Sequence, residues 1–251
     1  MSFVAPQVIA HRGIPGLFPE NTLVSLTRSL ANPHASDGVE LDVRLSADGE
    51  LFVFHDPETE RLAGVPGSIE DRSAVEIEAL RVSGELIPRL AQVLEAVLEA
   101  APPGRPALLN VEVKMPREPA LIVRRLRPLL DPLMADSRVE LVVSSFDPRV
   151  LSQALGQQAP WRLALLYESA AVLECLDALE SRGVLDLHPA DELVTPEHLA
   201  AFAQEQEGRP RRCVRVWTVD DPWRARALAS LGVDAIITNQ PGRIRRALWS
   251  C

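Results

Sequence analysis

Charged side chains occur inside short apolar segments, where a lone charge would be costly to bury. Glu40 and Asp42 lie in GVELDVRL, and Glu112 and Lys114 lie in NVEVK. Because side chains alternate along a strand, each pair shares one face. The carboxylates offer oxygen ligands for Mg²⁺ or Ca²⁺ and leave positions open for water and substrate. The alternative is a buried ion-pair network in which Arg12 and Lys114 neutralise the acids.

Two histidines accompany these charged residues. His11 precedes Arg12 at the end of one apolar segment, and His55 follows another in LFVFHD. Imidazole groups exchange protons near neutral pH and serve as general base and general acid. Arg12 and Lys114 beside a metal would also suit an anionic group such as a phosphate. These residue types favour a site that binds an anion such as phosphate beside a metal and has a base and an acid next to it.

The segments that carry these residues alternate with amphipathic segments, which is the pattern of a parallel α/β fold. Eight such units in 251 residues are typical of a (β/α)₈ TIM barrel, whose strand C-termini line the active site. A doubly wound open sheet is the alternative, but no GxGxxG sequence occurs. The predicted strands are 7–11, 38–45, 107–113, 139–145, 162–167, 184–188, 213–219 and 234–238. The predicted helices are 22–31, 90–100, 120–130, 149–155, 171–181, 196–207, 222–232 and 243–249.

The second predicted strand turns back on itself instead of entering a helix. The Asp-Gly dipeptide at 48–49 is typical of a two-residue type I′ hairpin, and that register places Asp42 directly opposite His55. We expect a β-hairpin extension after strand 2 and a small insertion or lid at residues 57–88, before strand 3. Residues 1–251 are expected to form one barrel domain.

Composition limits the classes of protein and partner. Hydrophobic residues make up 47% of the chain and charged residues 24%, as in an ordinary globular protein. No stretch reaches the roughly 18 apolar residues of a membrane span, and the first residues do not resemble a secretory signal. A net charge of −9 without a basic stripe argues against nucleic acid as a partner. We expect a cytoplasmic protein, without stable membrane insertion, that acts on a small molecule.

Five segments carry a family resemblance, in the order AHRGIPGLFPENT, GVELDVRLSADGELFVFHD, LNVEVK, VWTVDD and GVDAIITNQP. Together they span residues 10–241 and resemble the glycerophosphodiester phosphodiesterase family. HRG with PENT, ExD, HD and ExK in one chain is far more specific than any single motif. The resemblance implies a (β/α)₈ barrel that uses a divalent metal to hydrolyse glycerophosphodiesters to glycerol 3-phosphate and an alcohol.

The resemblance also implies roles for single residues. The implied acid–base pair is His11 and His55, and the implied metal ligands are Glu40, Asp42 and Glu112. The implied substrate contacts are Arg12 and Lys114 at the phosphate and Trp217 at the glycerol. Glu20 and Asn21 are implied to brace the mouth, although Asn21 could instead be only a helix cap. His188, at the end of another predicted strand, is a further expected substrate contact.

The chain departs from the family pattern near its last two strands. Asp220 stands where Asn is expected, and Asn239 stands where Asp is expected. The insertion at 57–88 is short for the family, which predicts an open mouth and broad head-group selectivity. Two alternatives stay open: a lipid phosphodiesterase like lysophospholipase D or phospholipase C, and a phosphate-binding barrel without catalysis. The sequence leaves open the leaving alcohol, the choice between Mg²⁺ and Ca²⁺, the division of roles between the histidines, and whether water or the substrate's 2-hydroxyl attacks.

Overall fold

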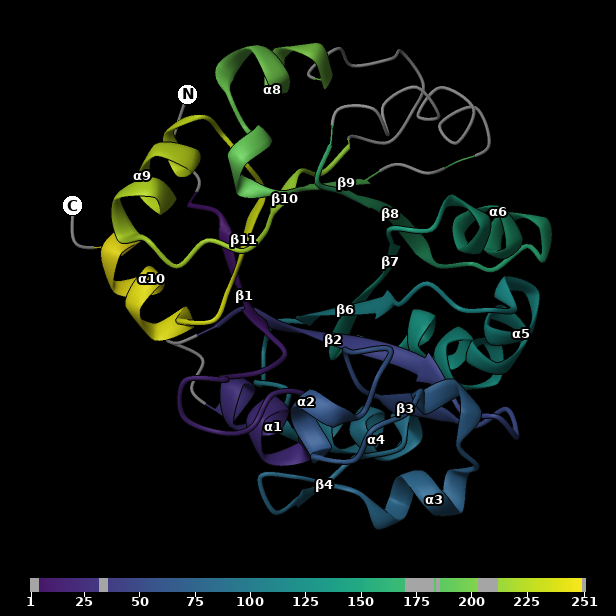
Figure 1. Cartoon of the computed structure of the whole chain (residues 1–251). Helices are drawn as coiled ribbons and strands as arrows, with labels where there is room; N and C mark the ends of the chain where they lie inside the picture. The colour runs from purple at the N-terminus through teal and green to yellow at the C-terminus, as the bar shows by residue number, and fades with distance from the viewer. Residues whose placement is uncertain (1–4, 32–35, 170–182, 184–185, 203–211, 250–251) are drawn as a thin grey trace.

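Eight parallel strands form a nearly closed barrel, ordered β10-β11-β1-β2-β6-β7-β8-β9 (Figure 1). The computed structural model describes residues 5–31, 36–169, 183, 186–202 and 212–249. At the seam, isolated parallel bridges join Leu187 to Val214 and Ala190 to Trp217. The barrel strands are β1 (Gln7–His11), β2 (Gly38–Leu45), β6 (Ala107–Val113), β7 (Val139–Ser145), β8 (Arg162–Tyr167), β9 (Asp186–Pro189), β10 (Arg215–Val216) and β11 (Ala235–Thr238).

Each segment predicted to be a barrel strand contains one. Those at 7–11, 38–45, 107–113, 139–145 and 162–167 have the predicted bounds. The strand predicted at 213–219 is reduced to the two residues of β10, because its flanking residues make only single bridges across the seam. The first two residues of the strand predicted at 184–188 lie outside the described residues.

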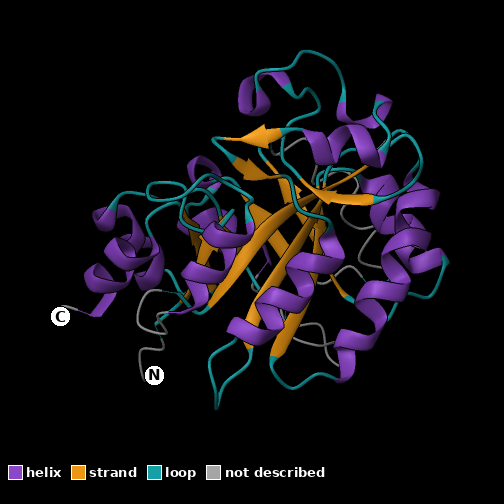
Figure 2. Cartoon of the chain, turned by 90° about the horizontal axis from the view of Figure 1, so that it is seen from below, coloured by secondary structure: helices purple, strands orange, loops and turns teal. Residues whose placement is uncertain are grey.

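Helices surround the barrel strands (Figure 2). They are α1 (Leu23–Ala31), α4 (Leu90–Ala100), α5 (Pro119–Leu130), α6 (Pro148–Gly156), α8 (Pro196–Phe202), α9 (Pro222–Ser230) and α10 (Pro241–Trp249). The helix predicted at 171–181, and the end of the one predicted at 196–207, lie outside the described residues. Within the described part of the chain, no helix combines the length and apolarity needed to cross a bilayer.

The helices begin and pack for identifiable reasons. The carboxylates of Asp147 and Asp221 accept hydrogen bonds from backbone N–H groups in the first turns of α6 and α9, and a proline follows each cap. The apolar faces of α1, α4, α5 and α6 pack against β2, β6, β7 and β8 in one core. Those of α9 and α10 pack against β1, β10 and β11 in a second core. This packing fixes the strands whose ends form the mouth.

The hairpin after β2 is present, but its predicted register is wrong. β2 pairs with β3 (Leu51–Val53) one residue out of the predicted register. The connecting loop holds three residues instead of two, and its last residue, Gly49, has a φ of +84°. A left-handed glycine that ends a three-residue loop is the next most common hairpin design. Phe54, not His55, therefore lies opposite Asp42, and its N–H donates to the Asp42 carbonyl at 2.9 Å.

The insertion at 57–88 folds as a small structure against β3. It contains α2 (Glu60–Ala63), α3 (Ala74–Ala79), and the short strands β4 (Arg81–Val82) and β5 (Glu85–Leu86). Its apolar side chains pack on Phe52 and Phe54 of the hairpin, which ties the insertion to the end of β2. Short 3₁₀ turns lie at Ile69–Asp71, Asp131–Ala135 and Asp191–Leu193.

Candidate active site

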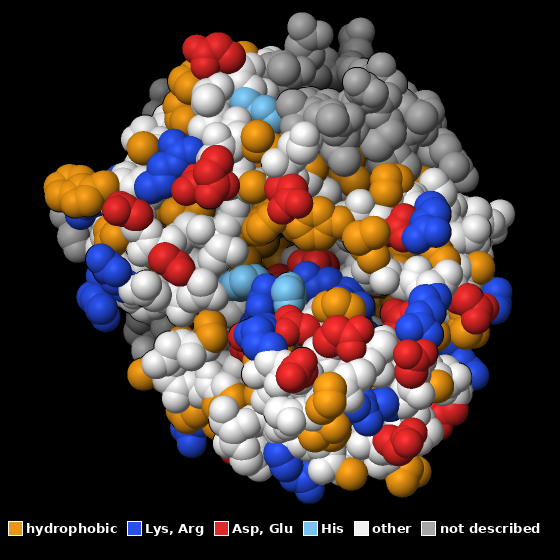
Figure 3. Space-filling model, in the orientation of Figure 1, with side chains coloured by type: hydrophobic (Ala, Val, Ile, Leu, Met, Phe, Trp, Pro, Cys, Tyr) orange, Lys and Arg blue, Asp and Glu red, His pale blue; other side chains and the backbone are white. Residues whose placement is uncertain are grey.

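A cavity of about 600 Å³ lies at the carboxyl ends of the barrel strands. Figure 3 shows a hollow in the middle of this face, with histidine, basic and acidic side chains gathered beside it. Most of the predicted site residues line the cavity, namely His11, Arg12, Glu40, His55, Glu112, Lys114 and Trp217. The structure therefore brings together residues that lie as much as 206 positions apart, between His11 and Trp217.

The predicted metal ligands meet where β2 and β6 run side by side. Asp42 pairs with Glu112 across these parallel strands, and Glu40 lies two residues before Asp42 on the same face. One carboxylate oxygen from each of the three residues lies within 4.8 Å of the others. None of the three residues is more than 5% exposed. The strand alternation read from the sequence thus gives the expected cluster.

Two cations neutralise part of this buried charge. Lys114 Nζ lies 2.9 Å from Asp42 Oδ1 and also pairs with Glu112. Arg12 Nε lies 3.2 Å from Asp42 Oδ2, and the Arg12 backbone N–H donates to Glu40 at 2.9 Å. Burial alone would raise the pKa of Asp42, but Lys114 and Arg12 hold it well below its usual range. The ion pairs weighed as an alternative are therefore present, and they centre on Asp42.

The remaining acids are not fully balanced by those cations. Glu40 Oε1 is buried and accepts no hydrogen bond from the described residues. Burial, and then the charges of Asp42 and Glu112, raise the pKa of Glu40 well above its usual value. Burial also raises the pKa of Glu112. An unpaired oxygen and two buried carboxyl groups with raised pKa values fit a hard divalent cation, which takes oxygen ligands.

His11 lies at the end of β1, beside Glu40 of β2. Its Nδ1 is 2.8 Å from Asn239 Oδ1, and its Nε2 is 3.9 Å from Glu40 Oε2. Burial, and then the positive charge of Arg12, lower the pKa of His11 to about 4. The imidazole is therefore neutral at neutral pH and can accept a proton.

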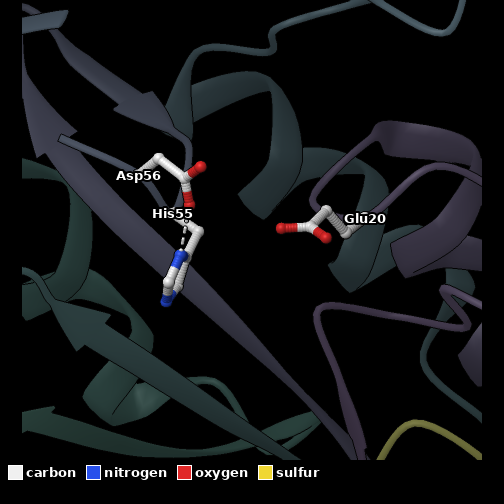
Figure 4. A group of neighbouring side chains, drawn as sticks. All are labelled: Glu20, His55 and Asp56. Atoms are coloured by element: carbon white, nitrogen blue, oxygen red, sulfur yellow. Dashed lines mark hydrogen bonds and ion pairs between the residues drawn. The ribbon is translucent and has the colours of Figure 1, made fainter. Parts of the chain in front are cut away.

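His55 reaches the mouth from the segment after β3. Its Nδ1 lies 2.6 Å from Asp56 Oδ1, and the carboxylate of Glu20 points toward the pair (Figure 4). These residues lie close enough to hold an ion, but Arg61 of α2 donates to Asp56 at 2.5 and 2.7 Å and to Glu20 at 3.0 Å. Burial raises the pKa of Asp56, yet hydrogen bonds from Arg61 and His55 lower it to about 2. Asp56 therefore stays ionised and orients the His55 ring.

The residues expected to brace the mouth contact the site directly. Asn21 Nδ2 donates to Asp42 Oδ2 at 2.7 Å, and Glu20 accepts a hydrogen bond from Arg12 at 2.9 Å. Asn21 is not the cap of α1, since the helix starts at Leu23 and the hydroxyl of Thr22 accepts the cap hydrogen bond. Asn21 thus holds a buried carboxylate in place.

Trp217 and His188 are neighbours, but their side chains lie differently with respect to the cavity. Trp217 lines the cavity, and its ring meets the Phe146 ring edge-on with centroids 5.3 Å apart. The His188 side chain is completely buried and is not part of the cavity lining. Its backbone carbonyl accepts a hydrogen bond from Trp217 Nε1 at 2.7 Å. The structure therefore places His188 beneath the tryptophan and away from the cavity.

The sequence reasoning missed several residues of the site. Arg44 lies two positions after Asp42 and Asn110 two before Glu112, and both line the cavity. The same period of two that identified the carboxylates would have found them. Asp56 and Phe146 gave no such signal, because their positions depend on how the loops after β3 and β7 turn.

Comparison with known proteins places this chain in a family. A family model described as the glycerophosphoryl diester phosphodiesterase family matches residues 11–243. The chain belongs to this family. A glycerophosphodiester phosphodiesterase of Caldanaerobacter subterraneus subsp. tengcongensis is 30% identical over 246 residues, which is 93% of this chain and 94% of the relative. A glycerophosphodiester phosphodiesterase of Bacillus altitudinis is 29% identical over 246 residues, which is 94% of this chain and 96% of the relative.

Solved structures of phosphodiesterases share the barrel. An Oleispira antarctica phosphodiesterase in complex with the product sn-glycerol-3-phosphate has a TM-score of 0.81 and 26% identity, and the match covers 97% of each chain. The glycerophosphodiester phosphodiesterase of Thermotoga maritima has a TM-score of 0.74 and 24% identity, covering 96% of this chain and 97% of that one. The TIM-barrel-like architecture predicted from the sequence is thus confirmed.

Proposed function

We propose that this chain hydrolyses glycerophosphodiesters to glycerol 3-phosphate and an alcohol. The proposal is carried by the meeting of two histidines, three carboxylates and two cations at one cavity. Such a set can both neutralise phosphate charge and transfer protons. Membership of the family, and the product bound to the O. antarctica relative, support the same substrate class.

The proposal includes a divalent cation, Mg²⁺ or Ca²⁺, held by Glu40, Asp42 and Glu112. These acids supply the oxygen ligands that both ions prefer, and Glu40 Oε1 is free to bind. When bound, the cation would supply Lewis-acid stabilisation of charge on the phosphoryl oxygens.

Arg12 and Lys114 are proposed to bind the phosphate. Both line the cavity, and each already faces the carboxylate cluster. A guanidinium can donate two parallel hydrogen bonds to phosphate oxygens, whereas an ammonium acts as a compact point charge. Trp217 offers an apolar ring in the same cavity, against which the glycerol moiety would pack.

The two histidines are proposed to transfer the protons. His11 is neutral and faces the cluster, which suits it to take the proton of the nucleophile. Burial lowers the pKa of His55, while Asp42 and the hydrogen bond to the ionised Asp56 act in the opposite direction. Asp56 orients the ring, and we assign His55 to protonate the leaving alkoxide. The His11 ring reaches the cavity from the end of β1 and the His55 ring from the segment after β3, so they can act on different oxygens of the phosphate.

The deciding experiment measures turnover of a panel of phosphodiesters with Mg²⁺ or Ca²⁺, read as glycerol 3-phosphate release from the glycerophosphodiesters and as choline or phosphocholine release from lysophosphatidylcholine. The panel contains glycerophosphocholine, glycerophosphoethanolamine, glycerophosphoinositol and lysophosphatidylcholine, and His11→Ala prepared in parallel is the control. We expect release from at least one water-soluble diester and loss of that release in the control. Turnover of the lysolipid alone would favour a lipid phosphodiesterase. Binding of glycerol 3-phosphate without any turnover would favour a barrel that only binds phosphate.

A further inference from the structure

The two positions that depart from the family pattern contact each other, and Asn239 also contacts His11. Asn239 Nδ2 donates to Asp220 Oδ2 at 2.8 Å, and the Asn239 backbone N–H donates to Asp220 Oδ1 at 2.8 Å. Asn239 Oδ1 lies 2.8 Å from His11 Nδ1. The hydroxyl of Thr238 also donates to Asp220 at 2.8 Å. The exchanged Asp and Asn therefore form one chain of hydrogen bonds that ends at the imidazole.

Asp220 sets the direction of every hydrogen bond in this chain. An ionised carboxylate only accepts, so the amide of Asn239 must turn its NH₂ group toward Asp220. The amide oxygen then faces His11 Nδ1, and an amide oxygen also only accepts. His11 must therefore carry its proton on Nδ1, and the other nitrogen of the neutral ring keeps a lone pair.

The nitrogen with the lone pair is the one that faces the site. His11 Nε2 lies 3.9 Å from Glu40 Oε2, and the ring lines the cavity. Asn239 directly follows β11, which pairs with β1 up to the contact between Ala10 and Thr238. The hydrogen-bond chain is thus attached to strands of the barrel wall and cannot turn independently of His11.

We propose that Asn239 and Asp220 are positioning residues that hold His11 in the Nδ1-protonated tautomer, with Nε2 free to accept the proton of the nucleophile. The part of this inference that concerns the nucleophile rests on the proposed function. The tautomer itself is a property of the protein alone and is tested without substrate.

The tautomer is read by ¹⁵N NMR of the imidazole rings near pH 7, on the protein as purified and again with Mg²⁺ added. His11→Gln identifies the His11 signals by their loss. Neutral histidine in water prefers the proton on Nε2. A preference for Nδ1 in the protein must therefore be imposed by the groups around the ring. We expect His11 to carry it on Nδ1. A proton on Nε2 would overturn the proposal, whether or not the protein hydrolyses glycerophosphodiesters.

Asn239→Ala removes the amide that selects the tautomer. The His11 proton is expected to move to Nε2, and kcat to fall roughly 10–100-fold, as is typical when a partner that orients a functional histidine is lost. KM should change little, because Asn239 is not part of the cavity lining. A His11 that stays protonated on Nδ1 in this variant would contradict the proposal.

Exchanging the two side chains tests the pair. Asn239→Asp alone sets two carboxylates against each other, a repulsion that is expected to break the chain and lower kcat. Adding Asp220→Asn restores a carboxylate–amide pair and keeps an acceptor oxygen at His11 Nδ1. The double variant is therefore expected to show the Nδ1 tautomer and to recover most of the lost kcat. No recovery of either property would contradict the pairing.

Thr238→Val is the matched control for a general loss of structure around Asp220. It removes one hydrogen bond to Asp220 but leaves the amide against His11. We expect the Nδ1 tautomer and a kcat within a few-fold of the parent. If Thr238→Val and Asn239→Ala lowered kcat equally with no change of tautomer, the chain would have only a structural role.

Discussion

Among single residues, Lys114 is a position where the shape of the cationic group should matter as well as its charge. It is the only lysine among 26 basic residues, and its ammonium lies between Asp42 and Glu112, 5.9 Å from the centre of the Phe146 ring. A guanidinium has a wider planar head and would have to displace one of these neighbours. The surroundings of Lys114 thus favour a functional reason for the lone lysine.

Lys114→Arg should therefore behave as a loss of function. We expect kcat/KM to fall by about 10²–10³, the range for loss of one preorganised electrostatic donor. Arg12→Lys is the reciprocal variant, and it should also be impaired because it loses bidentate contact with phosphate. Steady-state kinetics measure both. Parent-like kcat/KM in Lys114→Arg would show that the site does not distinguish the two cations.

The histidines have a separate test. His11→Ala and His55→Ala should each lower turnover by roughly 10²–10⁴, the usual contribution of general acid–base catalysis. Both rings are at the mouth and outside the apolar cores, so the melting temperature should change little. Turnover within a few-fold of the parent would remove that histidine from the mechanism.

The buried His188 side chain predicts that the stability of the fold depends on pH. Burial, and then Arg215, lower the pKa of His188 to about 3, while an unfolded chain takes up this proton below about pH 6.5. Between these values the unfolded state binds more protons, so the free energy of unfolding falls as the pH falls. By pH 4 the loss should reach roughly 3 kcal/mol.

His188→Asn isolates this contribution. Urea unfolding of parent and variant at pH 7 and pH 4 cancels the other titrating groups, and the parent should lose more stability between the two pH values. KM for the substrate should be unchanged, since the side chain is outside the cavity lining. An equal loss in both proteins would mean that the pKa of His188 in the fold is close to its value in the unfolded chain.

At the level of elements, the sequence predicts the strands and helices, which depend on local patterns of apolar and polar residues. It does not predict features that depend on how a turn folds. Strand and helix segments follow from apolar runs and caps, and several strands have the predicted bounds. The hairpin register does not follow in the same way, because a two-residue and a three-residue loop can both end in glycine at position 49. One extra loop residue moves His55 out of the paired strand.

Two glycines in the turn that follows β1 differ in how closely other atoms surround them, and this difference can be tested. Gly13 has a φ of +86°, and an added Cβ would lie 2.4 Å from the Ser25 hydroxyl and 2.5 Å from its backbone carbon. Gly13→Ala should lower the free energy of unfolding by roughly 2–4 kcal/mol, through left-handed strain and overpacking. Gly16→Ala in the same loop meets no atom within 4 Å and should change it by less than about 0.5 kcal/mol. Equal stability of the two variants in urea unfolding would show that the turn can relax.

For the whole molecule, parallel strands explain why so much of the site could be predicted. Their carboxyl ends meet at one mouth, so residues at strand ends converge whatever their distance in the sequence. Contacts made by loops could not be predicted in this way. Arg61 of the insertion donates to Glu20 and to Asp56. Such contacts depend on loop conformation, which no periodicity encodes.

The cluster of buried acids at this mouth leads to a prediction for the stability of the entire barrel. Glu40 and Glu112 have raised pKa values because of burial, so a cation that binds their ionised forms stabilises the fold that positions them. At a free Mg²⁺ or Ca²⁺ concentration of about 100 times Kd, linkage gives roughly 2.7 kcal/mol. For a chain of this size that raises Tm by roughly 5–10 °C.

Thermal melts with and without each cation measure this shift, and chelation should reverse it and abolish turnover. Asp42→Asn removes one proposed ligand and is the matched control, in which the shift should largely disappear. Glu168→Gln changes an acid at the rim of the same cavity that is not in the carboxylate cluster, so its shift should be kept. Full turnover after chelation, or no Tm shift with either cation, would instead favour the ion-pair network of Arg12 and Lys114 as the only balance of these charges. An equal shift in Asp42→Asn would mean that the cation binds elsewhere.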